Sequence, residues 1–196
     1  MANTEINKEK INKSKIIILS SPSGAGKTTI ANYLAKRNEN MIISVSATTR
    51  NKNHSEIEGK DYYFISKEEF LNKISNKELL EYTEIYNNYY GTIKNIVELY
   101  IKQGKTIIFD IDWVGHKLIK EKITHIKIIS FFIVPPSLEE LKNRLIKRSR
   151  ENPDLIEQRL EQTSKEMKFK DEYNHIVIND SIERALEEIE KIIKNS

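Results

Sequence analysis

Residues 20–28 hold the feature that most constrains the fold, a glycine-rich turn between an apolar run and a helical pattern. The apolar run is Lys-Ile-Ile-Ile-Leu at residues 15–19, and the turn reads Ser-Ser-Pro-Ser-Gly-Ala-Gly-Lys-Thr. Gly24 and Gly26 let the backbone bend tightly, so that successive N–H groups point into one concavity at the positive end of a helix dipole. The stretch therefore predicts a strand, a phosphate-binding loop and a helix.

The turn matches the pattern G-x-x-x-x-G-K-[ST], except that Ser21 stands in place of the first glycine. In such a loop Lys27 reaches the outer phosphates of a nucleoside triphosphate, and Thr28 holds Mg²⁺. An ordinary turn with a chance lysine is the alternative, but the helical spacing of apolar residues over 30–35 argues against it. The motif indicates a triphosphate and no particular reaction. The residues expected to contact it are Ser21, Pro22, Ser23, Gly24, Ala25, Gly26, Lys27 and Thr28.

Length and composition indicate one soluble globular domain. The chain has 196 residues, 38% hydrophobic and 31% charged, and it contains no cysteine, which excludes disulfides and thiolate metal sites. A net charge of +3 is too small to argue for nucleic acid, and no apolar run approaches the roughly 20 residues of a membrane helix. Residues 1–14 are polar and are expected to form a flexible tail. A cytoplasmic location without membrane or nucleic-acid partners is the default expectation.

Strand-like and helix-like segments alternate along the chain, which predicts an α/β fold with a doubly wound parallel sheet. Residues 47–92 differ, because short tyrosine-rich runs surround a helix at about 67–75, and we interpret them as an inserted lobe. A capping box at Ser137 and Glu140 is expected to begin one helix. Strands are expected near 15–20, 42–46, 105–111, 126–134 and 174–178, and helices near 27–38, 93–103, 114–121, 137–149, 154–168 and 181–194.

Two further groups of charged residues are candidates for phosphoryl chemistry. Asp110 ends the buried run 107–109, where a carboxylate beside the metal is expected; the alternative is a cap on the helix that begins near Val114. Arg144 and Arg148 share a helix face and Arg159 lies on the next helix. A mobile hairpin of arginines would place positive charge on a migrating phosphoryl group. Solvated arginines on a charged surface are the alternative.

Several ordered motifs resemble the guanylate kinase family of P-loop nucleoside monophosphate kinases. The similarity runs from about residue 15 to residue 194, and together the motifs are far more specific than the phosphate loop alone. They are S-V-S-A-T-T-R at 44–50, G-K-D-Y at 59–62, N-Y-Y-G-T at 88–92, D-I-D-W-V-G at 110–115, P-P-S at 135–137 and V-I-N-D at 177–180.

The resemblance implies a kinase that uses Mg²⁺ and ATP to make GDP from GMP, and dGDP from dGMP, in purine nucleotide metabolism. It implies a core at 15–46, 93–136 and 169–194, a GMP-binding lobe at about 47–92 and a helical lid at about 137–168. Monomer and homodimer both remain open. For the donor side it implies Lys27, Arg144, Arg148 and Arg159 as catalytic residues, Asn179 near adenine, and Thr28 and Asp110 on the metal, the latter through water. For GMP it implies Ser46, Arg50, Tyr62, Glu81, Tyr90, Gly91, Thr92 and Asp112, the last near the guanine amine or the metal.

The chemistry of Glu81 is coherent without the family. Guanine presents N1–H and an exocyclic amine side by side, and one carboxylate accepts both in a charge-assisted pair. Adenine lacks this donor pair and would leave a buried carboxylate unpaired, a mismatch that can discriminate by roughly 10⁴–10⁵. A surface acid on an edge strand is the alternative for Glu81, and packing roles are the alternative for isolated tyrosines.

One departure from the family pattern bears on the acceptor site. The family usually shows T-T-R-x-P-R, whereas here Asn53 stands at the second arginine and Lys52 at the proline. A neutral amide does not grip phosphate bidentately as a guanidinium does. Asn53 is therefore expected to weaken the hold on GMP, with Lys52 as a candidate point charge in its place. A catalytically inactive interaction domain and a related kinase with another small acceptor are the competing hypotheses.

Overall fold

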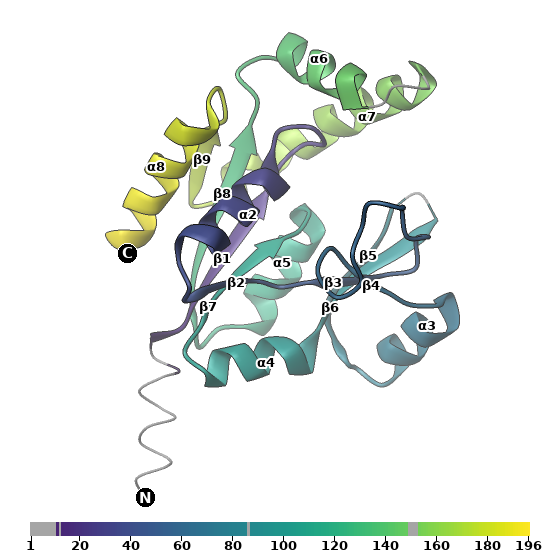
Figure 1. Ribbon diagram of the computed structural model, residues 1–196, viewed down its shortest axis with the longest axis vertical. Helices are drawn as coiled ribbons and strands as arrows, with labels where there is room; N and C mark the ends of the chain where they lie inside the picture. The colour runs from purple at the N-terminus through teal and green to yellow at the C-terminus, as the bar shows by residue number, and fades with distance from the viewer. Residues whose placement is uncertain (1–10, 12, 86, 149–152) are drawn as a thin grey trace, which may run out of the picture.

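The central element of the molecule is a parallel β-sheet (Figure 1). The computed structural model describes residue 11 and residues 13–85, 87–148 and 153–196. Every neighbouring pair of strands in this sheet is parallel, as the buried apolar runs predicted. In spatial order the strands are β2 (Met41–Ile43), β7 (Thr106–Asp110), β1 (Lys15–Ser20), β8 (Lys127–Val134) and β9 (His175–Ile178).

Helices cover both faces of this sheet because successive residues of each strand point to opposite sides. Ile17 and Leu19 of β1 face a cluster that includes Leu34 and Leu186. Ile16 and Ile18 face the cluster on the other side of the sheet. The first face carries α2 (Lys27–Arg37) and α8 (Ile182–Lys194), and the second carries α4 (Lys94–Lys102) and α5 (Trp113–Lys122).

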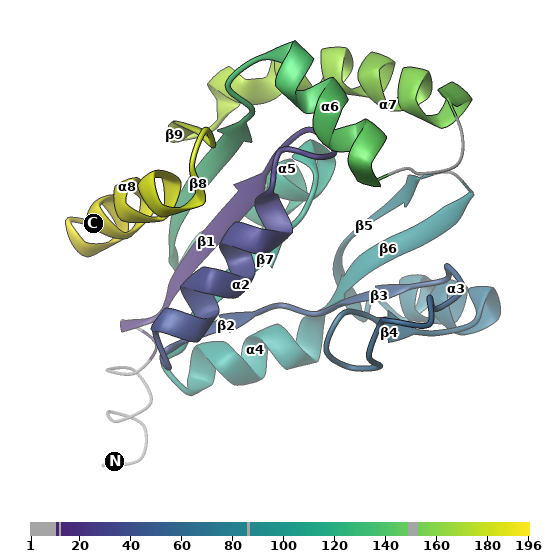
Figure 2. The same cartoon turned by 45° about the horizontal axis from the view of Figure 1, so that its top comes forward.

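A second, smaller sheet lies beside the first (Figure 2). It has its own apolar cluster around Phe70, Ala47 and Leu79. Ser66 and Glu69 form a capping box that begins the helix of this region. In spatial order the strands are β4 (Tyr63–Phe64), β3 (Ser46–Thr48), β6 (Asn88–Ile93) and β5 (Leu79–Ile85), and the helix is α3 (Lys67–Ser75).

Two helices, α6 (Leu138–Arg148) and α7 (Pro153–Glu166), run together beyond the carboxyl end of the sheet (Figure 1). The chain returns to β9 through the 3₁₀ helix η1 (Met167–Glu172). A methyl group on Gly24 would lie 3.0 Å from Cδ2 of Leu145, so α6 packs directly on the glycine-rich turn. Across the described residues, no helix combines the length and apolarity that crossing a membrane requires.

The structure corrects three of the expected boundaries. The strand expected over 42–46 is two elements: β2 ends at Ile43, and Ser46 begins β3 of the smaller sheet because it pairs with Thr92. The helix expected over 154–168 ends at Glu166 and continues as η1. Ser14, expected in the tail, is buried and donates from Oγ to the backbone O of Ile101 at 3.0 Å. The other expected elements agree within two residues, apart from residue 149, which lies outside the described residues.

Candidate active site

The buried side chain of Asn179 forms a hydrogen bond to the glycine-rich turn between β1 and α2. The side-chain amide of Asn179 donates from Nδ2 to the backbone O of Ala25 at 2.7 Å, and Asn179 is 2% exposed. Gly26 is the N-cap of α2 with a φ of 97°, which an L side chain rarely adopts. A Cβ at Gly26 would also overlap Nδ2 of Asn179. The expected residue Asn179 therefore meets the loop, on its buried side.

Lys27 begins α2 and reaches across to the end of β7. Its Nζ lies 2.8 Å from Oδ1 of Asp110 and donates to the backbone O of Ile111 at 2.9 Å. These contacts use two of the three donors of the ammonium group. The pairing of Lys27 with Asp110 places both expected residues at the mouth of the loop, where the strands β1 and β7 end side by side.

The donor set around Lys27 suits Mg²⁺ better than a transition metal. Thr28 is exposed on the first turn of α2, so its hydroxyl is accessible, and Asp110 supplies a carboxylate nearby. No group of three or more His, Cys, Asp or Glu side chains among the described residues could enclose a metal ion. Mg²⁺ commonly binds through one or two protein oxygens and completes its shell with phosphate oxygens and water. The residues present fit that mode.

Asp112, expected at the guanine or the metal, caps a helix. Its Oδ1 accepts a hydrogen bond from the backbone N of Gly115 at 2.8 Å, so it is the N-cap of α5. The capping role that we considered for Asp110 thus falls to Asp112, two residues later. One Asp112 carboxylate oxygen is therefore occupied by this hydrogen bond. The first turn of α5 also lies beside Glu81, the residue expected to bind guanine.

Of the three arginines expected in the lid, Arg144 makes hydrogen bonds that can be named. Arg144 on α6 donates from Nε to Oε1 of Glu140 at 2.9 Å and from Nη2 to the backbone O of Asn179 at 3.1 Å. Arg159 is half-buried on α7, and the side chain of Arg148 lies outside the described residues. Arg144 is therefore tied to the residue that holds the glycine-rich turn.

The capping box expected at the start of α6 is half formed. The backbone N of Glu140 donates to Oγ of Ser137 at 3.0 Å. The Glu140 carboxylate pairs with Arg144 instead of turning back to the cap.

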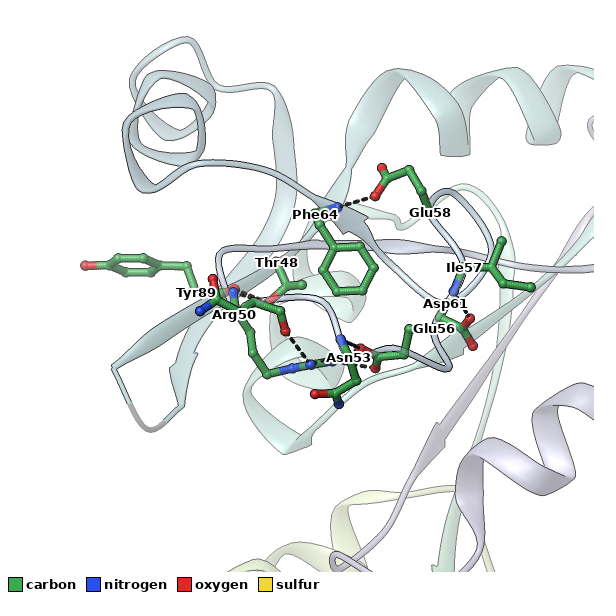
Figure 3. A network of polar contacts seen from close by, with 10 residues as sticks. Thr48, Arg50, Asn53, Glu56, Ile57, Glu58, Asp61, Phe64 and Tyr89 are labelled. Atoms are coloured by element: carbon green, nitrogen blue, oxygen red, sulfur yellow. Dashed lines mark hydrogen bonds and ion pairs between the residues drawn. The ribbon is translucent and has the colours of Figure 1, made fainter.

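Arg50 leads a network of polar contacts in the loop after β3 (Figure 3). Its guanidinium makes a paired contact with Glu56, with N–O distances of 3.0 and 2.6 Å. Glu56 also accepts from the backbone N of Asn53 at 2.8 Å. This contact raises the pKa of Arg50 and lowers the pKa of Glu56, because each charge favours the other. The position of the absent second arginine thus lies beside the guanidinium of the first.

Two of the expected tyrosines gather around Arg50. The ring of Tyr62 lies 5.4 Å from the guanidinium carbon, and the rings of Tyr62 and Tyr90 meet edge to face at 5.9 Å. Burial raises the pKa of Tyr62 to about 12, and the negative charge of Asp110 adds to the shift. Tyr62 therefore joins the guanidinium of Arg50 to the ring of Tyr90.

Glu81 is a buried carboxylate at the junction of the two sheets. It is 3% exposed, and its Oε1 accepts from the hydroxyl of Thr92 at 2.5 Å. Burial raises the pKa of Glu81 to about 7, the bond from Thr92 opposes that shift, and the charge of Asp112 adds to it. Ser46 and Gly91 are placed beside this pair, since Ser46 opposes Thr92 and Gly91 precedes it in β6. A buried acid whose pKa is shifted by burial and by a neighbouring charge is a candidate for a functional site.

Sequence reasoning missed two carboxylates. Glu56 pairs with Arg50 across a loop, and no local spacing pattern signals such a pair. Glu166 ends α7, and among the described residues its Oε2 is buried without a hydrogen-bond partner. Burial raises the pKa of Glu166, with Lys27 and Asp112 among the charges that act on it. Its closeness to the donor site depends on the return of α7 over the sheet.

Comparison with known proteins agrees with this geometry. A family model for guanylate kinase matches residues 13–196. The chain belongs to the guanylate kinase family. A guanylate kinase from Clostridium perfringens (strain SM101 / Type A) is 45% identical over 184 residues, which cover 94% of this chain and 84% of the relative. One from Rickettsia felis is 44% identical over 182 residues, covering 93% and 94% respectively. The match to guanylate kinases spans both sheets and the α6–α7 pair.

A solved guanylate kinase shares the fold. The crystal structure of guanylate kinase from Anaplasma phagocytophilum matches with a TM-score of 0.76 at 35% identity, covering 93% of this chain and 85% of that one.

Proposed function

We propose that the protein transfers the γ-phosphoryl group of ATP to GMP, making GDP and ADP. The observation that carries the proposal is a buried carboxylate, Glu81, which pairs with Thr92 in the smaller sheet, in a chain whose parallel sheet carries a glycine-rich turn after β1. The family membership supports the same reaction. None of the contacts proposed below involves the ribose 2′-hydroxyl, so dGMP is an expected second acceptor.

Guanine recognition follows from hydrogen-bonding capacity. Ionised Glu81 accepts from N1–H and the exocyclic amine together, while Thr92 orients one carboxylate oxygen and Ser46 lines the adjacent edge. Arg50, Tyr62 and Tyr90 offer a guanidinium and two hydroxyl donors to the GMP phosphate. Burial of Glu81 makes selection strict, because a base without two donors leaves a desolvated charge unpaired.

Transfer needs no protein nucleophile, because the phosphate oxygen of the acceptor is already anionic. Backbone N–H groups among residues 23–27 cradle the donor phosphates, and the remaining donor of Lys27 reaches the outer ones. Thr28, and Asp110 through a water, would hold Mg²⁺, which would neutralise charge on the donor phosphates. Arg144, Arg148 and Arg159 stabilise the negative charge that spreads over the migrating group, and the α6–α7 pair excludes water.

The larger organisation is part of the proposal. Residues 15–46, 93–136 and 169–194 act as a core, residues 47–92 as a GMP-binding lobe and residues 137–168 as a lid that closes over bound substrates. A cytoplasmic location and a monomeric or homodimeric state remain predictions.

A direct assay of GDP formation tests the donor half of the proposal. Lys27→Ala is expected to lower kcat by about 100-fold or more, the effect of removing one charged donor from a transition state. Lys36→Ala, on the exposed side of the same helix, is the matched control and should behave as wild type. Near-normal turnover by the Lys27 variant would reject the donor site.

The acceptor half is tested by selectivity. Glu81→Gln is expected to reduce the preference for GMP over AMP by about 10- to 100-fold, since a charge-assisted pair becomes a neutral and mismatched one. Other nucleoside monophosphates are screened with the wild type in the same assay. A strong preference for one of them over GMP would favour a kinase with another acceptor, and binding of GMP without any turnover would favour an interaction domain.

A further inference from the structure

An irregularity in β5 turns Glu81 out of its sheet. Leu79 pairs with Ile93 and Tyr82 pairs with Gly91, so Leu80 and Glu81 together oppose the single residue Thr92. This is a β-bulge, a device that redirects side chains next to functional sites. As a result, two consecutive residues pack in different apolar clusters. Leu79 packs in the cluster of the smaller sheet, and Leu80 packs in the cluster on one face of the central sheet.

The redirected Glu81 carboxylate meets the first turn of α5. Its Oε1 accepts from Thr92, as described above, and its Oε2 lies on the other side, against Gly115. A Cβ at Gly115 would stand 3.1 Å from Oε2 of Glu81 and 3.2 Å from Cβ and Cδ1 of Ile111. These separations are tighter than ordinary contact, so an added methyl group would displace the carboxylate or the helix.

Space, and not backbone conformation, explains the glycine. Gly115 lies within the regular helix α5, where glycine is about 1 kcal/mol less favourable than alanine. Its backbone N already bonds to Asp112, so the first turn is fixed in place. Lys122, near the other end of α5, donates to the backbone O of Leu80, which fixes the bulge against the same helix. The backbone is therefore held on both sides of the contact, so the shift caused by an added methyl group falls on the Glu81 carboxylate.

We propose that Gly115 is a specificity-determining positioning residue, which leaves the space in which the Glu81 carboxylate aligns with both donors of guanine. The inference rests on the proposed function of Glu81 and extends it to a residue that touches no substrate. The start of a helix dipole beside Oε2 also favours the ionised carboxylate that the recognition requires. The Glu81 carboxylate therefore lies between two groups, the Thr92 hydroxyl at Oε1 and the Gly115 backbone beside Oε2.

Gly115→Ala tests the proposal through two acceptors. Inosine monophosphate keeps N1–H but lacks the exocyclic amine, so it uses half of the paired contact. The variant is expected to raise KM for GMP by about tenfold, the loss of roughly one hydrogen bond to a charged group. KM for inosine monophosphate and for ATP should change less than about threefold, and kcat should stay within the same range. Lys117→Ala, exposed on the same helix, is the control and should leave all these values unchanged.

A second-site variant separates positioning from damage. Glu81→Asp shortens the acid and withdraws it from the new methyl group, so adding Gly115→Ala to Glu81→Asp should change KM for GMP less than about twofold. Such non-additivity is expected of residues in contact and not of independent ones. Alanine is the better helix former, and thermal unfolding of each variant checks that the fold persists.

The outcomes distinguish the two layers of the argument. Undiminished GMP preference in Gly115→Ala overturns the inference, provided that Glu81→Gln loses its preference. Equal losses on both acceptors together with a lowered Tm also overturn it, because a structural role would explain them. If Glu81→Gln itself keeps the preference, the proposed guanine site fails first.

Discussion

At the residue scale, the burial of Glu81 bears on how the proposed binding of GMP depends on pH. Removal from water disfavours the charged form and raises the pKa of this carboxyl to about 7, with the charge of Asp112 adding to the shift and Lys122 opposing it. Below that pH the group carries a proton. A protonated carboxyl would present a donor to the donors of guanine, so the state proposed to bind GMP is the one populated at higher pH.

We therefore expect KM for GMP to be flat above about pH 8 and to rise as pH falls through 7, approaching tenfold per unit below it. The measurement is KM for GMP between pH 5.5 and 9 at saturating ATP. Because a phosphate monoester also titrates near pH 6, Glu81→Gln is measured in parallel and should show only that shallower dependence. Parallel profiles for the two proteins would contradict the assignment of Glu81.

Asn53 lies next to the guanidinium of Arg50. Its backbone N shares the Glu56 carboxylate with Arg50, so its side chain starts beside the guanidinium proposed for the GMP phosphate. Asn53→Arg is expected to lower KM for GMP by about tenfold, because a second guanidinium adds a charge-assisted contact to phosphate. Asn53→Gln is the control for side-chain length. Unchanged KM in the arginine variant would mean that another cation, such as Lys52, already serves the phosphate.

At the scale of elements, one residue joins three parts of the chain. Asn179 follows β9; its side-chain amide donates to Ala25 in the glycine-rich turn, its backbone N donates to Val134 at the end of β8, and its backbone O accepts from Arg144 on α6. These contacts fix the direction of the loop carbonyl and therefore of the N–H groups around it. The family resemblance implies that Asn179 lies near the adenine of ATP. The contacts in the structure indicate a second role, in which Asn179 supports the loop itself.

Asn179→Ala is expected to raise KM for ATP about tenfold and to leave KM for GMP within about twofold, because the loop loses a buried hydrogen bond of roughly 1–3 kcal/mol. Hydrogen exchange of residues 21–27 without nucleotide distinguishes the two roles, since loss of a purely adenine contact would leave that exchange unchanged. Asn179→Asp cannot donate to the Ala25 carbonyl and should be at least as impaired. Wild-type exchange in both variants would reject the role in the loop.

At the scale of the whole molecule, the proposed donor and acceptor sites belong to different sheets. The loop and Lys27 lie at the carboxyl end of the parallel sheet, and Glu81, Arg50 and Tyr90 lie on or beside the smaller one. Each nucleotide should therefore bind and stabilise the protein without the other. Because the two sites are separate, a single substitution should remove the stabilisation by one nucleotide and leave the stabilisation by the other unchanged.

Thermal unfolding with one nucleotide at a time measures this independence. At 100 times its Kd, GMP should stabilise the protein by about 2.7 kcal/mol, or roughly 5–10 °C in Tm for a chain of this size. Glu81→Gln should lose the GMP shift and keep that of Mg·ATP, and Lys27→Ala should do the opposite. A protein that responds to neither nucleotide would contradict both proposed sites.

Local patterns were sufficient for much of the fold. The phosphate loop, the helix after it and the buried strand before Asp110 follow from spacings within a few residues, where covalent geometry leaves few alternatives. Strand ends were less predictable, as at Ser46, because hydrogen bonding to Thr92 and not local propensity assigns that residue to the smaller sheet. Ser14 was misplaced for the same reason, since its partner, Ile101, is distant in the chain.

The sequence by itself determined that this is an α/β protein with a glycine-rich turn after its first strand and an inserted second lobe, because short motifs and periodic apolar residues indicate those features. The tertiary structure alone decided which groups meet: Lys27 with Asp110, Asn179 with Ala25, and Glu81 with Gly115. Such meetings depend on strand order, on a bulge in β5 and on how closely one helix approaches a strand. These are consequences of packing many distant segments at once, and no spacing along the chain encodes them.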